Sequence, residues 1–290
     1  MLRSEPLFTV IIPHRNLPHL LERCLDSIPC EEWIQTIVVD DGSDMDVFTG
    51  EQRTAVRRRQ VELIENQHSN AGHARNLGLE RAQGKWLLFA DSDDFYTEEA
   101  WETLQQYAAD TADLLIFKAE SVDSDTLQPS GRAEHINLLV DECNRGHLDV
   151  RQAALATHVP WAKMVRRCFV ERYFIRFDEV KASNDTMFAT QCACLAEEIK
   201  FIPTAIYVNT TRGGSLWMSR MKDADNYLSR IEVYIRRNQY VKKFGFRQTP
   251  VLGLCLDARH ISFSTMLRAF ALVVRHGALL QGLENYFHRK

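Results

Sequence analysis

Short apolar runs alternate with helix-like segments from residue 7 to residue 117, and this alternation constrains the fold more than any other feature. The apolar runs have the length of buried strands, whereas the segments between them have helical spacing or a helix-compatible composition. The expected strands are 7–12, 36–39, 61–64, 85–90 and 114–117, and the expected helices are 17–28, 50–59, 72–82 and 98–109. The pattern predicts an α/β protein, in which a mostly parallel sheet is sandwiched by helices in a Rossmann-like arrangement.

Polar clusters follow three of these predicted strands at the point where each strand ends. They are His14-Arg15-Asn16, Asp40-Asp41-Gly42-Ser43 and Asp91-Ser92-Asp93-Asp94. In parallel α/β sheets, ligands bind beyond the carboxyl ends of the strands. We therefore expect all three clusters to converge on one edge of the sheet and to form a binding site there.

The third cluster places three carboxylates directly after the apolar run 86–90. Carboxylates this close repel one another and are costly to desolvate, so folding alone does not call for them. A hard divalent cation such as Mg²⁺ or Mn²⁺ would relieve the repulsion, because these ions take oxygen ligands and often bridge to phosphates. An acidic turn that caps the helix beginning near Thr97 is the alternative interpretation.

A second polar segment, residues 70–78, carries Gly72, Arg75 and Gly78 around the expected start of a helix. A helix N-terminus with an arginine in its first turn is a ready site for an anion or a nucleotide. The glycines are also compatible with a simpler purpose, since small residues let a helix pack closely against a sheet.

Composition excludes several classes of protein. The chain has 290 residues, a hydrophobic content of 45% and seven scattered cysteines, which indicate neither a disulfide framework nor a zinc site. The sequence contains no apolar run long enough to span a bilayer, and its N-terminus lacks the features of a signal peptide. We expect a cytoplasmic protein that does not bind nucleic acid.

The C-terminal part is basic and helix-like. Residues 220–290 contain 13 Lys or Arg against five Asp or Glu, a local net charge of +8 in a chain whose net charge is −4. We expect two parts, a catalytic domain at 1–219 and a basic helical extension at 220–290. Basic amphipathic helices can lie on anionic membranes, so the extension favours peripheral contact with the inner face of a membrane. A helical extension with a solvated basic face is the alternative.

The motifs VIIPHRN, VVDDGS, NxGxxxARNxG and FADSDD occur in this order between residues 10 and 94. Together they resemble the nucleotide-sugar-binding half of family 2 glycosyltransferases, which have the GT-A fold. The resemblance is dense over residues 7–118 and continues more sparsely through 160–163, 176–178 and 184–185 to about residue 215.

The resemblance implies a site for the nucleotide of a sugar donor, most simply a UDP-sugar. Asp41 would accept a hydrogen bond from the uracil ring, Arg75 would reach the base, and Asp91 would lie near the ribose. Asp93 would bind Mn²⁺ or Mg²⁺ on the diphosphate, while the role of Asp94 stays open. The expected donor contacts are Pro13, Arg15, Asp40, Asp41, Asn70, Gly72, Arg75, Asp91, Ser92 and Arg212, the last in a loop that can fold over the diphosphate.

The resemblance also implies an acceptor side. Family members usually carry a Glu-Asp pair at the start of a downstream helix, and here the pair reads Asn184-Asp185. Asp185 is the candidate base that takes the proton from the acceptor hydroxyl, although a plain helix cap is the alternative. Trp161 and Lys163 occupy positions that line the acceptor side in the family, and Trp161 could instead belong to the core.

The sequence therefore predicts an inverting, metal-dependent glycosyltransferase. By analogy with the family, the acceptor would be a glycan or a lipid-linked glycan in cell-surface polysaccharide synthesis. A catalytically idle protein that only binds a nucleotide sugar is the main alternative, and Asn184 is its only support. A nucleotidyltransferase is a further alternative, but the N-terminal part shows no glycine-rich, lysine-bearing triphosphate loop.

Overall fold

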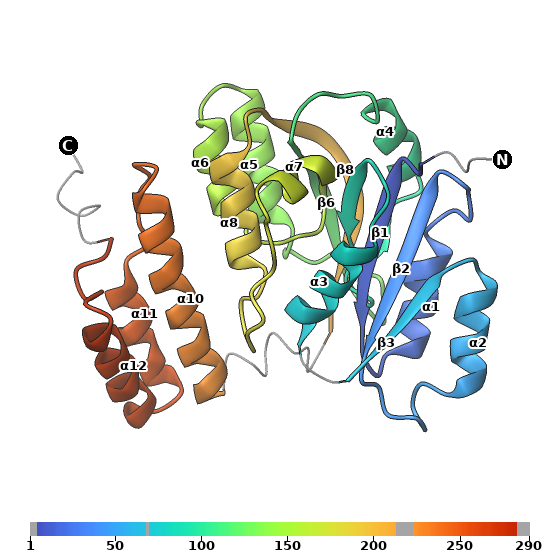
Figure 1. The fold of residues 1–290 in the computed structure, drawn as a ribbon. Helices are drawn as coiled ribbons and strands as arrows, with labels where there is room; N and C mark the ends of the chain where they lie inside the picture. The colour runs from blue at the N-terminus through green and yellow to red at the C-terminus, as the bar shows by residue number, and fades with distance from the viewer. Residues whose placement is uncertain (1–4, 68–69, 213–222, 283–290) are drawn as a thin grey trace.

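The computed structural model describes residues 5–67, 70–212 and 223–282, and an eight-stranded mixed sheet forms its centre (Figure 1). The order of the strands is β3-β2-β1-β4-β7-β6-β8-β5. Their bounds are β1 Phe8–His14, β2 Ile34–Asp41, β3 Glu62–Asn66, β4 Trp86–Phe89, β5 Phe95–Tyr96, β6 Leu114–Asp123, β7 Lys163–Arg166 and β8 Ile199–Thr211.

The first four strands in this order are parallel, which confirms the predicted sheet. In the register of β1 and β2, Phe8 lies opposite Ile34 and His14 lies opposite Asp40. β1 also pairs with β4 in parallel, so that Phe8 lies opposite Trp86. The carboxyl ends of β1, β2 and β4 therefore point to the same edge. β7 is antiparallel to β4 and to β6, which makes the sheet mixed beyond this half.

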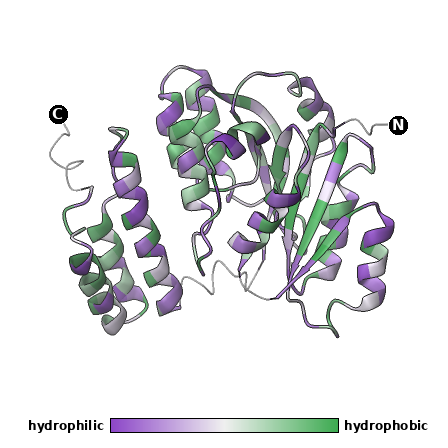
Figure 2. Cartoon of the chain, in the orientation of Figure 1, coloured by the Kyte–Doolittle hydropathy of each residue, from purple (hydrophilic) through white to green (hydrophobic). Residues whose placement is uncertain are grey.

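Helices cover both faces of the parallel half because its buried strands are apolar on both sides. Ile37 and Val39 pack with Ala74 of α3 (Ala71–Arg81). Val38, between them, belongs to the main core with residues of α1 (Pro18–Asp26) on the opposite face. Figure 2 shows the strands of this half as a largely hydrophobic layer. The remaining helices of this part are α2 Gly50–Arg58 and α4 Ala100–Gln106.

The region from residue 119 to the start of α8 (Thr186–Leu195) contains structure that the sequence pattern left unassigned. β6 continues to Asp123, well beyond the predicted end at Phe117. After β6 the chain forms three helices and one strand before α8, and Figure 1 places the helices together beside the sheet. In chain order, these three helices and the strand are α5 Glu134–Asn144, α6 Val150–Ala156, β7 and α7 Arg167–Arg172.

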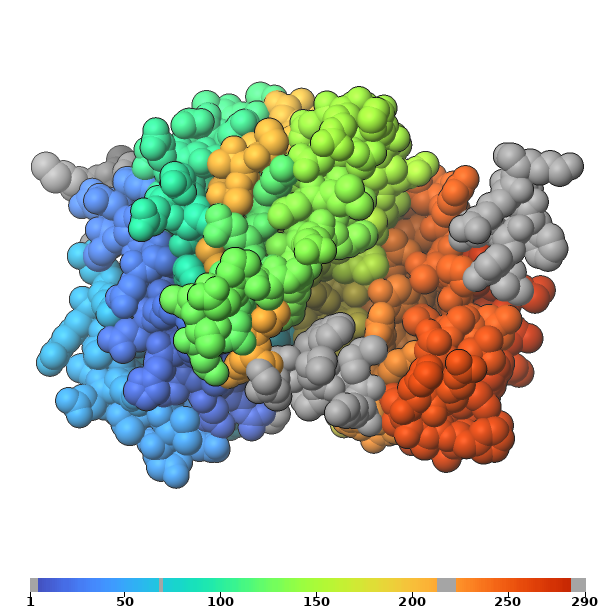
Figure 3. All heavy atoms as spheres, turned by 180° about the vertical axis from the view of Figure 1, so that it is seen from behind, coloured from blue at the N-terminus to red at the C-terminus, as the bar shows by residue number. Residues whose placement is uncertain are grey.

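The C-terminal part is helical, as predicted, and has a small core of its own. It comprises α10 (Ala224–Lys242), α11 (Val251–Asp257), a short 3-10 helix (Ala258–His260) and α12 (Phe263–Arg275). α10 also packs against α8, and its Val241 belongs to the main core. Figure 3 shows this part in orange and red against the yellow-green segments of the body. The predicted boundary between residues 219 and 220 lies outside the described residues.

None of the helices in the described part of the chain combines the length and the apolar character needed to cross a bilayer.

α3 lies so close to β1 that one of its positions has no room for a side chain. A Cβ atom on Gly78 would lie 2.4 Å from Cγ2 of the buried Ile11. The glycine therefore fixes the distance between α3, which begins at the site, and the strand whose end also forms it. This packing accounts for one of the two glycines of the NxGxxxARNxG motif.

We predict that Gly78→Ala lowers the free energy of unfolding by about 1–2 kcal/mol, because an overpacked core costs more than the gain in helix propensity. Chemical denaturation monitored by circular dichroism measures the change. Gly253→Ala in α11 is the matched control, since a Cβ atom there meets no atom within 4 Å. The control should be neutral or stabilising, and equal losses in the two variants would contradict the packing explanation.

Candidate active site

A cleft of about 1080 Å³ opens at the edge where the parallel strands end. It runs from the loops after β1 and β4 across the start of α3 to the loop before α8 and the side of α10. Most of the predicted site residues line it. They are Pro13, Arg15, Asp41, Asn70, Arg75, Asp91, Ser92, Asp93, Trp161, Asn184, Asp185 and Arg212.

The three polar clusters converge as expected, because Arg15, Asp41 and Asp91 line one cleft. One carboxylate oxygen from each of Asp91, Asp93 and Asp94 lies within 4.8 Å of the other two. The three side chains nevertheless have different surroundings, since Asp91 and Asp93 line the cleft and Asp94 is buried beneath it. Because of these different surroundings, we expect the three acids to have different roles.

Asp94 holds the acidic turn onto β8. Its carboxylate accepts hydrogen bonds from the Tyr207 hydroxyl at 2.9 Å, the Asn209 amide at 2.8 Å and the Thr210 backbone N–H at 2.7 Å. Burial and the neighbouring acids raise the pKa of Asp94, whereas the hydrogen bonds from Thr210 and Asn209 favour its ionised form. We infer that Asp94, whose role the sequence left open, is a structural residue.

Asp93 turns its carboxylate toward the cleft. The carboxylate lies 3.4 Å from a guanidinium nitrogen of Arg212, while its backbone carbonyl accepts hydrogen bonds from Arg23 and from the Thr210 hydroxyl. Burial, followed by the charge of Asp91, raises the pKa of the Asp93 carboxyl. The backbone of Asp93 is fixed by hydrogen bonds, while burial and Asp91 disfavour the ionised form of its carboxyl. Such a group suits a ligand for a hard divalent cation, because the cation would stabilise the ionised form.

Arg75 joins the two halves of the cleft. One of its terminal nitrogens donates to Asp91 at 2.6 Å, and the other donates to the Asn184 side-chain oxygen at 3.0 Å. The arginine is only 5% exposed, and its guanidinium also lies over the Phe177 ring. We expected Arg75 to reach the base of the nucleotide, but both terminal nitrogens are engaged by protein. Its position instead orients Asp91 and connects it to the loop that carries Asp185.

Asp185 occupies the N-cap position of α8 without acting as a side-chain cap. No capping hydrogen bond from the helix reaches its carboxylate, so the simple helix-cap interpretation lacks its defining contact. Burial raises the pKa of Asp185, an effect that Arg75 and Lys163 partly offset. A half-buried carboxylate with a raised pKa at the wall of a cleft has the character expected of a general base.

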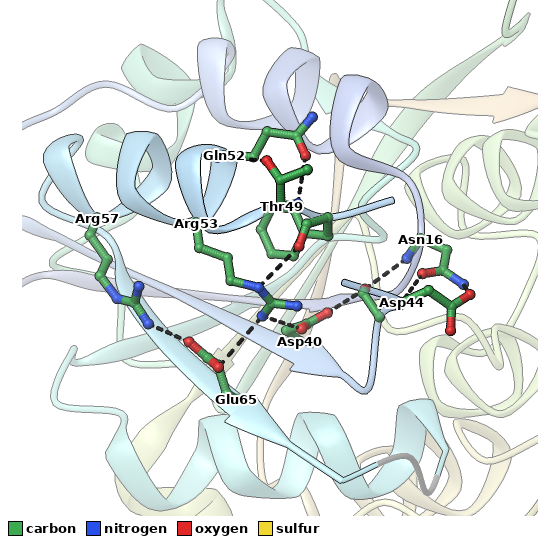
Figure 4. A network of polar contacts seen from close by, with 10 residues as sticks. Asn16, Asp40, Asp44, Thr49, Gln52, Arg53, Arg57 and Glu65 are labelled. Carbon is green, nitrogen blue, oxygen red and sulfur yellow. Dashed lines mark hydrogen bonds and ion pairs between the residues drawn. The ribbon is translucent and has the colours of Figure 1, made fainter. Parts of the chain in front are cut away.

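Asp40 and Asp41 point to different sides although they are neighbours. Asp41 lines the cleft. Asp40 binds Arg53 at 2.6 Å and accepts a short hydrogen bond from Ser43, and Figure 4 shows it within a polar network that ties the β2 loop to α2. Asp40 is 2% exposed and does not line the cleft, so the structure gives no support to the expected contact with the nucleotide: its carboxylate supports the loop.

Two other predicted site residues do not line the cleft. Gly72 lies where an added Cβ would come within 2.1 Å of the Asp178 carbonyl oxygen, so its role is close backbone packing. Lys163 is buried in β7, and its Nζ donates to the Thr157 carbonyl at 2.7 Å. Burial lowers the pKa of Lys163 to about 8. The sequence predicted that both residues contact a ligand, and the structure gives no support to this because neither lines the cleft.

Trp161 lines the cleft and also belongs to the core, so both sequence interpretations apply to it. Its ring stacks on Tyr207 with centroids 5.4 Å apart and an interplanar angle of 7°. Tyr207 is the same residue that donates to Asp94. The position of Trp161 is thus linked to that of the acidic turn through one shared neighbour.

Sequence reasoning missed the far wall of the cleft. This wall includes Arg132 and His135 from the segment around the start of α5, His158 from the loop after α6, and Arg230 and Tyr234 from α10. No short motif marks these residues, and they come from segments that are distant along the chain. The basic composition of the C-terminal part was the only available signal.

Residues 9–174 match the family model described as "Glycosyl transferase family 2". EpsJ, an uncharacterized glycosyltransferase of Bacillus subtilis, is 25% identical over 260 residues, which cover 87% of this chain and 73% of EpsJ. EpsH of the same organism is 26% identical over 70% of this chain, and the match spans only 60% of its length.

Solved structures show the same fold. Staphylococcus aureus TarS 1–349 in complex with UDP-GlcNAc superposes with a TM-score of 0.59 at 20% identity, covering 94% of this chain and 83% of the TarS chain. The likeness shows the GT-A fold. The described helices after residue 223 add a C-terminal helical part to it.

We predict that Asp94→Ala lowers the free energy of unfolding by about 3 kcal/mol, because three buried donors lose their acceptor. Asp93→Ala is the matched substitution in the same turn. It should cost less stability, because the Asp93 carboxylate is paired with the partly exposed Arg212 and not with three buried donors. Urea denaturation in EDTA measures both, and a larger loss for Asp93→Ala would refute the division.

Proposed function

The chain belongs to glycosyl transferase family 2, and from this premise we propose that it transfers a sugar from a UDP-sugar to an acceptor hydroxyl with inversion at the anomeric carbon. The observation that carries the proposal is the link Asp91–Arg75–Asn184, which connects the predicted donor end of the cleft to the residue beside Asp185. One buried arginine thus links Asp91, which is expected to bind the sugar donor, to the residue next to the candidate base, and all of them line one cleft.

The donor nucleotide would bind at the ends of β1, β2 and β4. Asp41 would accept from the base, with Arg15 and Pro13 beside it, and Asp91 would bind the ribose. All four residues line the cleft, which is consistent with this arrangement. TarS was solved with UDP-GlcNAc, and the choice of uridine here is a proposal drawn from that likeness.

Asp93 would hold a divalent cation, Mn²⁺ or Mg²⁺, against the donor diphosphate. The fit rests on the oxygen cluster with Asp91 and on the raised pKa of Asp93. A cation bound there would stabilise the negative charge that develops on the leaving diphosphate. Arg212, at 3.4 Å from Asp93, would bind the same phosphates through its guanidinium. A mannosyltransferase of Pyrobaculum calidifontis was solved with GDP-Man and Mn²⁺, at a TM-score of 0.56 and 20% identity, covering 96% of this chain and 79% of its own.

Asp185 would take the proton from the acceptor hydroxyl as that oxygen attacks the anomeric carbon. The attack comes from the face opposite the departing diphosphate, so the configuration at that carbon inverts. Its raised pKa brings the carboxylate closer to the basicity that proton transfer requires. Asn184 cannot supply a second base, but its amide oxygen holds Arg75 in place.

A catalytically idle protein is the second candidate, and it rests on Asn184 alone. Asp93 and Asp185 both reach the cleft with raised pKa values, and neither is engaged as the structural acid Asp94 is. These surroundings favour the active enzyme. Hydrolysis or transfer of a UDP-sugar that disappears in EDTA would exclude the idle protein.

We predict that Asp93→Asn abolishes metal-dependent donor binding, whereas Asp185→Asn keeps donor binding and lowers transfer at least about 100-fold, the usual contribution of a general base. Calorimetric titration with UDP and Mn²⁺ measures binding, and UDP release with acceptor present measures transfer. In the wild type, transfer should also fall as the pH drops through the raised pKa of Asp185, because the base must be ionised. An equal loss of UDP affinity in both variants would defeat these assignments.

The acceptor would be a glycan or a lipid-linked glycan of the cell surface, handled at the cytoplasmic face of a membrane. TarS is named as a poly(ribitol-phosphate) β-N-acetylglucosaminyltransferase, which is consistent with such an acceptor class.

The outer face of α12 supports membrane contact, because Phe263, Leu267 and Val274 lie on one side of the helix with 67%, 52% and 61% of their surface exposed. Arg268 and Arg275, both exposed, flank this side and suit anionic headgroups.

We predict that the double variant Phe263→Ser, Leu267→Ser loses at least half of its co-sedimentation with vesicles of anionic phospholipid. Burial of apolar surface and attraction to the headgroups both contribute to such binding. Phe174→Ser is the control, because Phe174 is 81% exposed on the body of the protein, outside the extension. Unchanged sedimentation of the double variant would disprove contact through α12.

A further inference from the structure

The C-terminal helices form one wall of the cleft. Asn226, Tyr227, Arg230 and Tyr234 of α10 line the same space as Trp161. These side chains repeat at helical spacing, so one face of α10 is turned toward the cleft. Figure 3 shows the C-terminal part lying against the body. The substrate that occupies this part of the cleft must therefore contact α10.

Specific polar contacts hold α10 at this position. Arg237, which is buried, donates to the Leu155 carbonyl at 2.9 Å, and Arg236 forms an ion pair with Asp178 at 2.9 Å. The Tyr234 hydroxyl lies 3.4 Å from Nδ1 of His158. Because these contacts anchor the helix to the body on the side of the cleft, the wall is a fixed part of the site.

Several cations lie on and behind this wall. Burial lowers the pKa of His158 to about 3, and the three charged groups that add most to this effect are Arg237, Lys163 and Arg230, all cations. Arg230 lies 5.5 Å from the centre of the Tyr234 ring, which places its guanidinium over an aromatic face. A cleft wall backed by several cations attracts anions and disfavours cationic ligands.

These cations are distinct from those that act on the predicted diphosphate site. Arg212 lies 3.4 Å from the Asp93 carboxylate. Arg230 lies on α10, where its guanidinium packs against the Tyr234 ring. The cleft therefore has cations on two different elements, one beside Asp93 and one on the wall formed by α10. The donor diphosphate accounts for the first of them only.

We propose that the acceptor carries a phosphate group, and that this phosphate binds against α10 at Arg230 with Tyr234 and His158 beside it. The proposal rests on the proposed function, since it names the chemistry of the acceptor in the same cleft. The guanidinium supplies charge-assisted hydrogen bonds to phosphate oxygens, while the Tyr234 ring packs against it and keeps it at the wall. Binding of the phosphate at this wall orients the acceptor and leaves Asp185 to the hydroxyl that reacts.

The test uses the full chain with UDP and Mn²⁺ held at saturation, so that the donor half is filled. Glycerol 3-phosphate and farnesyl monophosphate are titrated separately while the unfolding temperature is followed, with glycerol and farnesol as their neutral counterparts. A phosphate ligand of the folded state raises this temperature, and the neutral compounds should not. The two phosphates distinguish a polyol phosphate acceptor from a lipid phosphate acceptor.

Arg230→Gln should weaken phosphate binding about tenfold or more, the loss expected for a charge-assisted hydrogen bond, while the shift caused by UDP and Mn²⁺ stays unchanged. Arg230→Lys should retain part of the binding, because it keeps the charge. Arg172→Gln is the control, since Arg172 is exposed on α7 and does not line the cleft.

Stabilisation by neither phosphate, or equal binding in Arg230→Gln and the wild type, would overturn the proposal. A wild-type protein that UDP does not stabilise would instead overturn the proposed function. The phosphate titrations are repeated without UDP, so the two failures can be told apart.

Discussion

The buried carboxylate of Asp94 is the contact on which the geometry of the site depends. It accepts hydrogen bonds from Tyr207, Asn209 and Thr210, and so joins the turn after β4 to β8 at the other side of the sheet. The Thr210 hydroxyl also donates to the Asp93 carbonyl, which fixes the backbone of the acid that turns toward the cleft. Because the hydrogen bonds to buried Asp94 hold the turn in place, the carboxylates of Asp91 and Asp93 are not needed for this purpose and can contact a ligand.

Tyr207 carries this constraint across the cleft. Its hydroxyl donates to Asp94 and accepts from the Asp91 backbone N–H, while its ring stacks on Trp161. The proposed donor end and the proposed acceptor end are thus both contacted by one side chain on β8. Arg75 provides a second connection, from Asp91 to Asn184. With two independent links, the relative position of the carboxylates does not rest on any single loop.

The sequence predicted the parallel half of the fold well, because apolar strands buried on both faces and amphipathic helices leave a strong periodic signal. The location of the site followed from strand direction alone. The pattern could not distinguish adjacent acids such as Asp40 and Asp41, since only the packing of Arg53 decides which one turns inward. It also missed α5 and the α10 wall, because residues such as Arg230 reach the cleft through tertiary packing and not through a local motif.

The asparagine at position 184, where the resemblance to the family implies a glutamate, is compatible with the proposed catalysis once the charges are considered. Arg75 is a single buried cation that already binds Asp91 and lies close enough to lower the pKa of Asp185. A third carboxylate at 184 would compete for this arginine and add repulsion to both acids. The neutral amide oxygen accepts the same hydrogen bond without that repulsion. Asn184 thus leaves Asp185 as the one acid of the pair, and keeps Arg75 shared between Asp91, on the proposed donor side, and the residue beside the proposed base.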